Sequence, residues 1–293
     1  MSHFSQIIEK NIGRIFIGIP KLYFSPTYKR HLSTNIQADK LPFPDVLDVY
    51  WHIQAAFFIS IVGGWGRTLL GIGNKVKVYN HDRLLHFINN RPVGTPLITV
   101  CNHTSMLDDP ALIATLANWR VLFNSKKMRW SLAAKEICFS NRFFTYFCSH
   151  GKVIPVVRGA GVYQAAVDFT IKRLNAGDWV HVFPEGKVTL EPIRLKWGVG
   201  RMISECTKPP IVLPFYHTGM NDFLPTSKPY IPRFGKDITV CIGEPINYTN
   251  ILKRCQQQDC SQMELRKSLT DLVEQSFAKL KLQTEALHRC EPS

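Results

Sequence analysis

Short apolar runs separated by polar turns recur along residues 75–243. Six of these runs contain β-branched residues, which predicts strands over 75–79, 97–101, 152–158, 179–182, 211–216 and 238–242. Helical spacing of apolar residues predicts helices over 111–117, 162–175 and 263–288. Pro214 lies inside one strand run and predicts an edge or a bulge there. Because strands and helices alternate, we expect an α/β fold with a mixed, largely parallel sheet flanked by helices.

The most apolar stretch of the chain covers residues 55–66. A straight bilayer crossing takes about twenty apolar residues, and extending this stretch to Ile72 brings in Arg67. We therefore predict an interfacial or re-entrant anchor that dips into one leaflet, with Trp51 and Trp65 at the level of the headgroups. A buried core helix is the alternative.

The N-terminal segment differs from the rest in charge. Residues 1–38 contain five cations and a single acid, Glu9, and isoleucines recur at helical spacing until Pro20. A basic amphipathic segment favours mitochondrial targeting or membrane-surface binding, with an ordinary packed helix as the alternative. Pro42 and Pro44 then indicate a linker. We divide the chain into a basic segment, a linker with anchor, and a catalytic domain, at 1–40, 41–74 and 75–293.

The charge balance points to an anionic partner. The chain has 36 basic and 22 acidic residues, a net charge of +14. It contains no helix-turn-helix, zinc or RNA-binding signature, so a membrane surface is expected rather than nucleic acid. Eight cysteines are scattered without a Cys-x2-Cys pair, which predicts reduced thiols and no metal site.

The candidate chemistry lies in the polar turn at residues 102–110, directly after the strand run 97–101. If Thr104 or Ser105 caps the helix that follows, Asp108 falls in the first helical turn and its carboxylate can reach the imidazole of His103. A histidine oriented by a carboxylate is a general base near neutral pH. Because the chain has no Gly-x-Ser-x-Gly elbow, the nucleophile can be the substrate's own hydroxyl. The non-catalytic alternative is that His103 caps a helix and Asp108 is a solvated acid.

The spacing of two motifs resembles that of the glycerolipid acyltransferases. Asn-His-x4-Asp in 102–110 is followed by Phe-Pro-Glu-Gly at 183–186. Further stretches carry a closer resemblance to the branch of this family that remodels cardiolipin in mitochondria; they are 177–188, 195–201, 217–222, 232–235 and 265–271.

The resemblance also assigns substrate-binding roles. In the family, a strand-end arginine contacts the substrate's phosphate, which implies this role for Arg158, although Val157 stands where the family usually has an aspartate.

The Phe-Pro-Glu-Gly motif supplies the other candidate contacts. In the turn formed by Glu185 and Gly186, the carboxylate would hydrogen bond a glycerol hydroxyl or orient a cation. Arg194 and Lys196 are candidates for a second phosphate contact. Lys187 and the valine after it replace the usual Thr or Ser followed by Arg, so which of these cations touches lipid stays open.

The resemblance implies a transacylase that needs neither coenzyme A nor any metal or redox cofactor. It would move acyl chains between phospholipids such as phosphatidylcholine and monolysocardiolipin, and so remodel cardiolipin, at mitochondrial membranes facing the intermembrane space. The alternatives are an acyl-CoA-dependent lysophosphatidic acid or glycerol-3-phosphate acyltransferase, and a non-catalytic scaffold that binds anionic lipids. The oligomeric state, a homo-oligomer included, is left open by the sequence.

Overall fold

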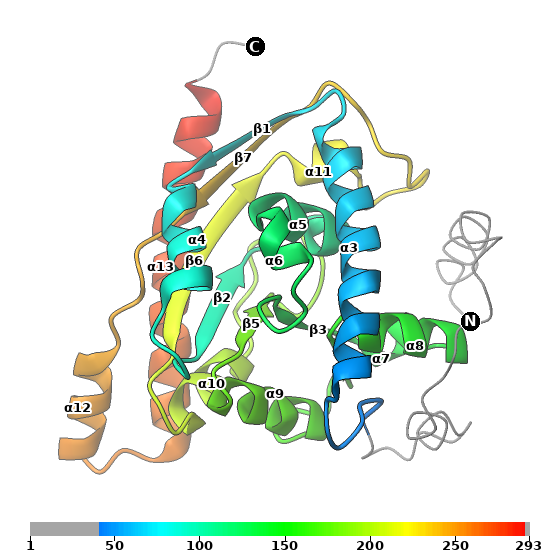
Figure 1. Ribbon diagram of the computed structural model, residues 1–293. Coiled ribbons are helices and arrows are strands. Elements are labelled where there is room, and N and C mark those ends of the chain that lie inside the picture. Colours follow the sequence, from blue (N-terminus) through cyan, green and yellow to red (C-terminus); the bar gives the residue numbers. More distant parts are fainter. Residues whose placement is uncertain (1–40, 291–293) are drawn as a thin grey trace.

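The centre of the molecule is a seven-stranded sheet in the order β1-β7-β6-β2-β5-β3-β4, seen in a computed structural model that describes residues 41–290 (Figure 1). All neighbouring strands are parallel except β6 and β7, as expected for a mixed, largely parallel sheet. The strands are β1 (Lys75–Tyr79), β2 (Leu97–Cys101), β3 (Trp130–Ala134), β4 (Val153–Val156), β5 (Trp179–Val182), β6 (Ile211–Thr218) and β7 (Asp237–Ile242). The predicted basic segment 1–40 lies outside the described residues.

Helices cover the sheet. The long C-terminal helix α13 packs against β6, β7 and α10, and α9 packs against β4 and β5. On the other side in Figure 1, α3 runs beside η1, α5 and α6. The helices are α3 (Val49–Gly71), α4 (His81–Asn90), η1 (Asp108–Leu112), α5 (Ile113–Leu116), α6 (Trp119–Leu122), α7 (Lys135–Cys138), α8 (Arg142–His150), α9 (Ala165–Asn175), α10 (Gly198–Glu205), α11 (Met220–Phe223), α12 (Thr249–Gln257) and α13 (Gln262–Arg289).

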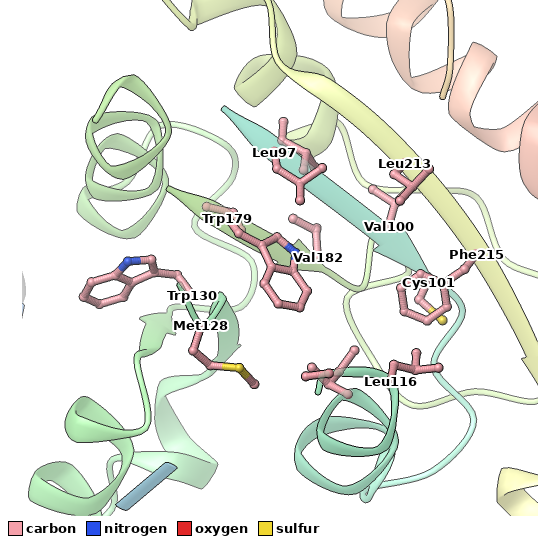
Figure 2. Packing of buried hydrophobic residues seen from close by; sticks show 14 of the residues in the cluster. Leu97, Val100, Cys101, Leu116, Met128, Trp130, Trp179, Val182, Leu213 and Phe215 are labelled. Carbon is pink, nitrogen blue, oxygen red and sulfur yellow. The ribbon is translucent and has the colours of Figure 1, made fainter. Parts of the chain in front are cut away.

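The core is built around β2, the central strand. All five of its residues are buried, because helices cover both faces of a parallel sheet and both faces must then be apolar. Trp179 on β5 and Trp130 on β3 fill the space beside it, and Leu116 approaches from α5 (Figure 2). The one polar side chain within β2, Thr99, accepts a hydrogen bond from the Trp179 indole at 2.8 Å. This packing fixes the end of β2, where the candidate chemistry begins.

The apolar stretch predicted over 55–66 is part of a longer helix. α3 has 23 residues and begins at an N-cap in which Asp48 accepts a hydrogen bond from the Trp51 amide at 2.8 Å. By length and composition it is long enough and apolar enough to cross a membrane, which the shorter stretch was not. The charge of Arg67 faces the protein, since it donates to the Ala117 carbonyl at 3.0 Å and lies over the Trp119 ring. α3 is therefore a candidate membrane anchor whose inner side is packed on the fold.

Two strands differ from the pattern-based expectation. β3 was not predicted, because its short apolar run is interrupted by Ser131 and follows a basic segment. β6 was expected to be an edge or bulged strand, but it lies inside the sheet between β7 and β2. Pro214 is tolerated there because its carbonyl accepts from Gly243 just beyond the end of β7, so the missing N–H falls where the β6–β7 ladder ends.

Candidate active site

Parallel pairing brings the two sequence motifs together. β2 pairs with β5 in parallel register, with Val100 opposite Val182, so the loops that follow both strands leave the same edge of the sheet. The first loop carries His103 and the second carries Glu185. The site therefore lies at the carboxyl ends of the central strands, where α/β folds commonly bind ligands.

His103 and Asp108 form the predicted pair. The imidazole Nδ1 lies 2.9 Å from Asp108 Oδ2. Because an ionised carboxylate can only accept, Nδ1 carries the hydrogen and Nε2 keeps its lone pair. The imidazole stacks on the Phe183 ring at 4.0 Å between centroids, and its side chain is 19% exposed while that of Asp108 is fully buried. The Asp108 carboxylate thus orients the imidazole and leaves the Nε2 lone pair free of that contact.

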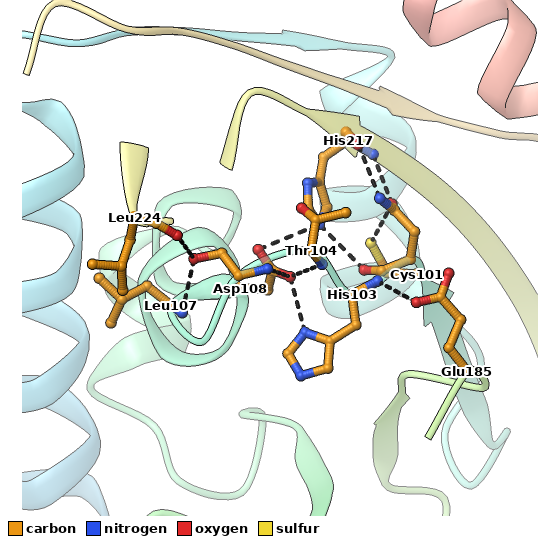
Figure 3. A network of polar contacts seen from close by, with 10 residues as sticks. Cys101, His103, Thr104, Leu107, Asp108, Glu185, His217 and Leu224 are labelled. Atoms are coloured by element: carbon orange, nitrogen blue, oxygen red, sulfur yellow. Dashed lines mark hydrogen bonds and ion pairs between the residues drawn. The ribbon is translucent and has the colours of Figure 1, made fainter. Parts of the chain in front are cut away.

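The Asp108 carboxylate also shapes its own loop (Figure 3). Its Oδ2 accepts from the amides of Thr104 at 2.8 Å and Ser105 at 2.9 Å. Burial alone would raise the pKa of Asp108, but the nearby His217 and the hydrogen bond from His103 hold that pKa well below its usual range. We expected Thr104 or Ser105 to cap a helix beginning before Asp108. Instead, η1 begins at Asp108, and the two amides are satisfied by its side chain.

A buried ion pair anchors the loop to the next part of the sheet. Asp109 pairs with Arg129, which directly precedes β3 and also donates to the Gly151 carbonyl at 3.3 Å. Burial would raise the pKa of Asp109, and the adjacent Arg129 guanidinium holds it below the usual value. The two consecutive aspartates thus have different partners, one facing the imidazole and one facing the sheet.

Glu185 contacts the backbone of the catalytic loop. Its Oε2 accepts from the His103 amide at 2.9 Å, and partial burial raises its pKa to about 7. Gly186 has a φ of +73°, a conformation that glycine adopts at no steric cost. It closes the turn by donating to the Phe183 carbonyl at 3.0 Å.

The amides of His103, Thr104 and Ser105 all donate to carboxylates. Any donor to an oxyanion therefore has to come from another group.

The three predicted phosphate-binding cations lie apart from one another. Lys196 is exposed and close to the Glu185 turn, where its amide donates to the Pro184 carbonyl at 2.7 Å. Arg158 follows β4 at the sheet edge, is half exposed, and lies 3.4 Å from Glu136. The structure brings Lys196 to the motif and places Arg158 two strands away.

Arg194 points toward the C-terminal helix. It forms a 3.2 Å ion pair with Asp271 on α13 and is 62% exposed. The phosphate-binding roles of all three cations stay predictions. Within the described part of the chain, no group of three or more His, Cys, Asp or Glu side chains is arranged to hold a metal.

His217, the first residue of the 217–222 stretch, is a site neighbour whose contact with Asp108 the motifs did not indicate. It lies near the end of β6, and its Nε2 is 3.5 Å from Asp108 Oδ1. The Asn102 side chain holds the backbone of His217: its Oδ1 accepts from the His217 amide at 2.9 Å and its Nδ2 donates to the His217 carbonyl at 3.0 Å. His217 lies at the end of an apolar strand, which the sequence shows. That this strand is next to β2 follows only from the order of the strands in the sheet.

These features define a class of protein. A hydrogen-bonded histidine and aspartate, His103 and Asp108, lie at the carboxyl end of the central strand, with Glu185 beside them. Residues 75–218 match the family model described as Acyltransferase. The fold is similar to that of the crystal structure of the 1-acyl-sn-glycerophosphate acyltransferase from Thermotoga maritima, with a TM-score of 0.50 and 21% identity over 77% of this chain and 80% of that chain.

Curated relatives narrow the class. The chain is 43% identical to Tafazzin of Drosophila melanogaster over 82% of its own length and 64% of that protein. It is 34% identical to the Dictyostelium discoideum protein named Taffazin, over 71% of this chain and 79% of the relative. It is also 39% identical to the N-acylphosphatidylethanolamine synthase of Arabidopsis thaliana, over 65% and 69% of the two lengths. The chain belongs to the tafazzin family of acyltransferases. It spans slightly less than two thirds of the Drosophila relative.

Proposed function

We propose that this protein is a phospholipid–lysophospholipid transacylase that works without coenzyme A. Acyl chains would move from phospholipids such as phosphatidylcholine to monolysocardiolipin, which remodels cardiolipin. The observation that carries the proposal is the His103–Asp108 pair, with Nδ1 hydrogen bonded at 2.9 Å and Nε2 left as a base, in a chain of the tafazzin family.

In the proposed reaction, His103 Nε2 takes the proton of the lysophospholipid's free hydroxyl while that oxygen attacks the ester carbonyl of the donor. Asp108 stabilises the imidazolium that forms, as the carboxylate of a serine-protease triad does. The tetrahedral intermediate collapses by breaking the bond to the donor's glycerol oxygen. The imidazolium then returns its proton to that oxygen, so one ester is formed and one is lost.

Substrate phosphates would be bound by cations around the site. Lys196 is the best-placed candidate, because it is exposed and its backbone is hydrogen bonded to the Glu185 turn. Arg158 and Arg194 would have to exchange their present carboxylate partners, Glu136 and Asp271, for a phosphate. Both ion pairs are half exposed or nearly so, and exposed pairs are held weakly enough for such an exchange.

The proposed location is a mitochondrial membrane, with the protein bound peripherally and facing the intermembrane space. Support comes from the basic sequence and from α3, whose exposed side carries large apolar residues in successive turns: Val49, Tyr50, Ile53, Phe57, Ile61 and Trp65. Such a face suits the hydrocarbon and headgroup region of one leaflet. The opposite face of α3 is occupied by the catalytic domain.

Two other acyl transfers are alternatives for the same site. A relative from Bacillus subtilis, 26% identical, is named 1-acyl-sn-glycerol-3-phosphate acyltransferase, which keeps acyl-CoA-dependent transfer as the first alternative. The Arabidopsis relative's name points to an amine acceptor, the headgroup of phosphatidylethanolamine. A scaffold that only binds lipid is the non-catalytic alternative.

One liposome experiment separates these candidates. Purified protein is added to vesicles containing monolysocardiolipin, phosphatidylethanolamine and phosphatidylcholine with a labelled acyl chain, without coenzyme A. Label in cardiolipin supports the proposal. A parallel reaction carries the label on added acyl-CoA instead. Label that moves only in that reaction, or only to the ethanolamine nitrogen, contradicts the proposal and selects the corresponding alternative. Vesicle binding without any transfer selects the scaffold.

A further inference from the structure

The two oxygens of the Asp108 carboxylate have unequal surroundings. Oδ2 accepts three hydrogen bonds, from His103 Nδ1 and from the amides of Thr104 and Ser105, at 2.8–2.9 Å. Oδ1 is buried and has no hydrogen-bond partner among the described residues. His217 Nε2 lies 3.5 Å from Oδ1 (Figure 3). Burying a carboxylate oxygen without a hydrogen-bond donor costs free energy. The group that faces Oδ1 therefore affects how stably the carboxylate is held.

The structure fixes which hydrogen His217 presents. Its Nε2 lies 3.2 Å from the Asn102 carbonyl oxygen. Because a carbonyl only accepts, Nε2 must carry the hydrogen, and this N–H lies between the Asn102 carbonyl and Asp108 Oδ1. The imidazole is fully buried, and Asn102 clamps the backbone of residue 217 in both directions. The ring cannot turn away to solvent.

We infer that His217 is a positioning residue for the proposed base: its Nε2–H faces Asp108 Oδ1 and orients the carboxylate so that Oδ2 points at His103. The site is then a line of three groups, His103–Asp108–His217, drawn from the loop after β2 and the end of β6. The inference rests on the proposed role of His103 as a base. His217 is too deeply buried to touch substrate, and it acts only through Asp108.

Paired substitutions of His217 test whether an N–H at the position of Nε2 is what orients Asp108. In His217→Gln the amide nitrogen can occupy the position of Nε2, whereas in His217→Asn it reaches only the position of Nδ1. His217→Phe keeps the ring without a donor. His150→Phe is the control, because His150 is an equally buried imidazole on α8 that is outside the site. Each variant is compared with wild type by thermal melting, by kcat and KM for monolysocardiolipin, and by NMR of histidine-labelled protein.

The expected result is a fall in kcat of about ten- to a hundredfold for the Asn and Phe variants, the factor that a hydrogen bond to a charged group is worth, with KM unchanged. The Gln variant should keep most of kcat. The downfield His103 Nδ1–H resonance should move in the Asn and Phe variants and stay in the Gln and His150→Phe variants. Equal kcat in the Gln and Asn variants, with an unmoved resonance, would overturn the inference. Activity retained by His103→Ala would instead overturn the proposed function.

Discussion

Asp108 has two functions in the site: it is the partner of the proposed base, His103, and it orders the loop that carries His103. The same oxygen that accepts from His103 also accepts from two backbone amides of residues 104 and 105. Hydrogen bonds from neutral amides and an imidazole to a buried carboxylate are individually stronger than neutral pairs. A change at this one side chain is therefore expected to alter chemistry and loop geometry together.

Asp108→Asn tests the tautomer. Donors face both oxygens of the carboxylate, His103, Thr104 and Ser105 at Oδ2 and His217 at Oδ1, so the NH2 of the asparagine meets a donor in either orientation. Where it faces His103 Nδ1, the imidazole places its hydrogen on Nε2 and the base is lost; where it faces His217, the carboxamide is displaced from its position behind His103. We expect kcat to fall by about three to four orders of magnitude, as for comparable carboxylate–histidine pairs, while vesicle binding is retained. Steady-state acyl transfer and co-sedimentation measure the two effects. Near-normal kcat would show that Asp108 does not orient the base.

Glu185→Gln tests the raised pKa of that carboxyl. Its pKa in the folded protein is about 7, against a usual value of 4.5. An acid whose pKa rises on folding binds its proton more tightly when folded, so its stabilisation is complete below about pH 4.5 and is lost as pH rises through 7. The glutamine mimics the protonated form and does not titrate. Melting temperatures from pH 5 to 8 should show wild type losing stability relative to the variant, and parallel curves would contradict this.

The His103–Asp108 pair could be predicted from spacing, because both residues lie in one short turn whose place after a strand was evident. Arg129 and His217 could not be predicted as partners of the two aspartates. They reach Asp109 and Asp108 from other strands, and only the order of the strands in the sheet reveals those contacts. The positions of Arg158 and Arg194 depend likewise on tertiary structure.

At the scale of elements, α3 packs against η1, the helix that directly follows the loop carrying His103. A Cβ added at Gly66 would lie 2.8 Å from Ala111 Cα, and one added at Gly63 would lie 2.9 Å from the Leu122 side chain. The two glycines thus let α3 approach the segment that begins at Asp108. Any residue that pushes α3 outward should disturb η1 first.

Gly66→Ala is therefore expected to destabilise the protein by about 1–3 kcal/mol, because the contact is with backbone and cannot relax by a side-chain rotation. Gly64→Ala in the same helix is the matched control, since its Cβ would have no neighbour closer than 3.9 Å. That variant should be neutral or more stable, given the better helix propensity of alanine. Denaturant unfolding of both variants measures the difference. Equal free energies of unfolding would contradict the tight packing.

Six of the seven strands could be predicted from periodicity, because they are short apolar runs bounded by polar turns; several of the shorter helices, among them α4, α8 and α12, were not predicted. The extent of α3 could not be predicted either, since its first turns contain Tyr50 and His52 and its polar groups are satisfied by the fold. His52, for example, lies 3.0 Å from the Ser125 hydroxyl. The local sequence pattern does not show such contacts between distant residues.

At the scale of the whole molecule, α3 has a protein side and an exposed apolar side. Phe57, Ile61 and Trp65 are 38–47% exposed, and Arg67 is turned toward the domain. An apolar stripe of this kind, on a protein of net charge +14, fits binding to an anionic membrane. The sequence indicated the anchor, but which side of it is free follows only from the packed structure.

The double variant Phe57→Asp/Trp65→Asp tests this face. The substitutions replace two apolar side chains of the proposed lipid-contacting face by charges, so binding to cardiolipin-containing vesicles should fall at least tenfold in flotation assays. The matched control is Met263→Asp/Leu282→Asp on α13, where both residues are exposed at 63% and 68%. Both variants change charge equally. An equal loss of binding would show a charge effect rather than a specific face.

The most direct test of the whole account is acyl transfer by His103→Ala in coenzyme-A-free vesicles holding monolysocardiolipin and labelled phosphatidylcholine. Loss of the base is expected to reduce the rate by about 10²- to 10⁴-fold, with vesicle binding close to wild type because His103 is not part of the exposed apolar face of α3. Transfer at the wild-type rate would contradict the central claim that His103 is the general base.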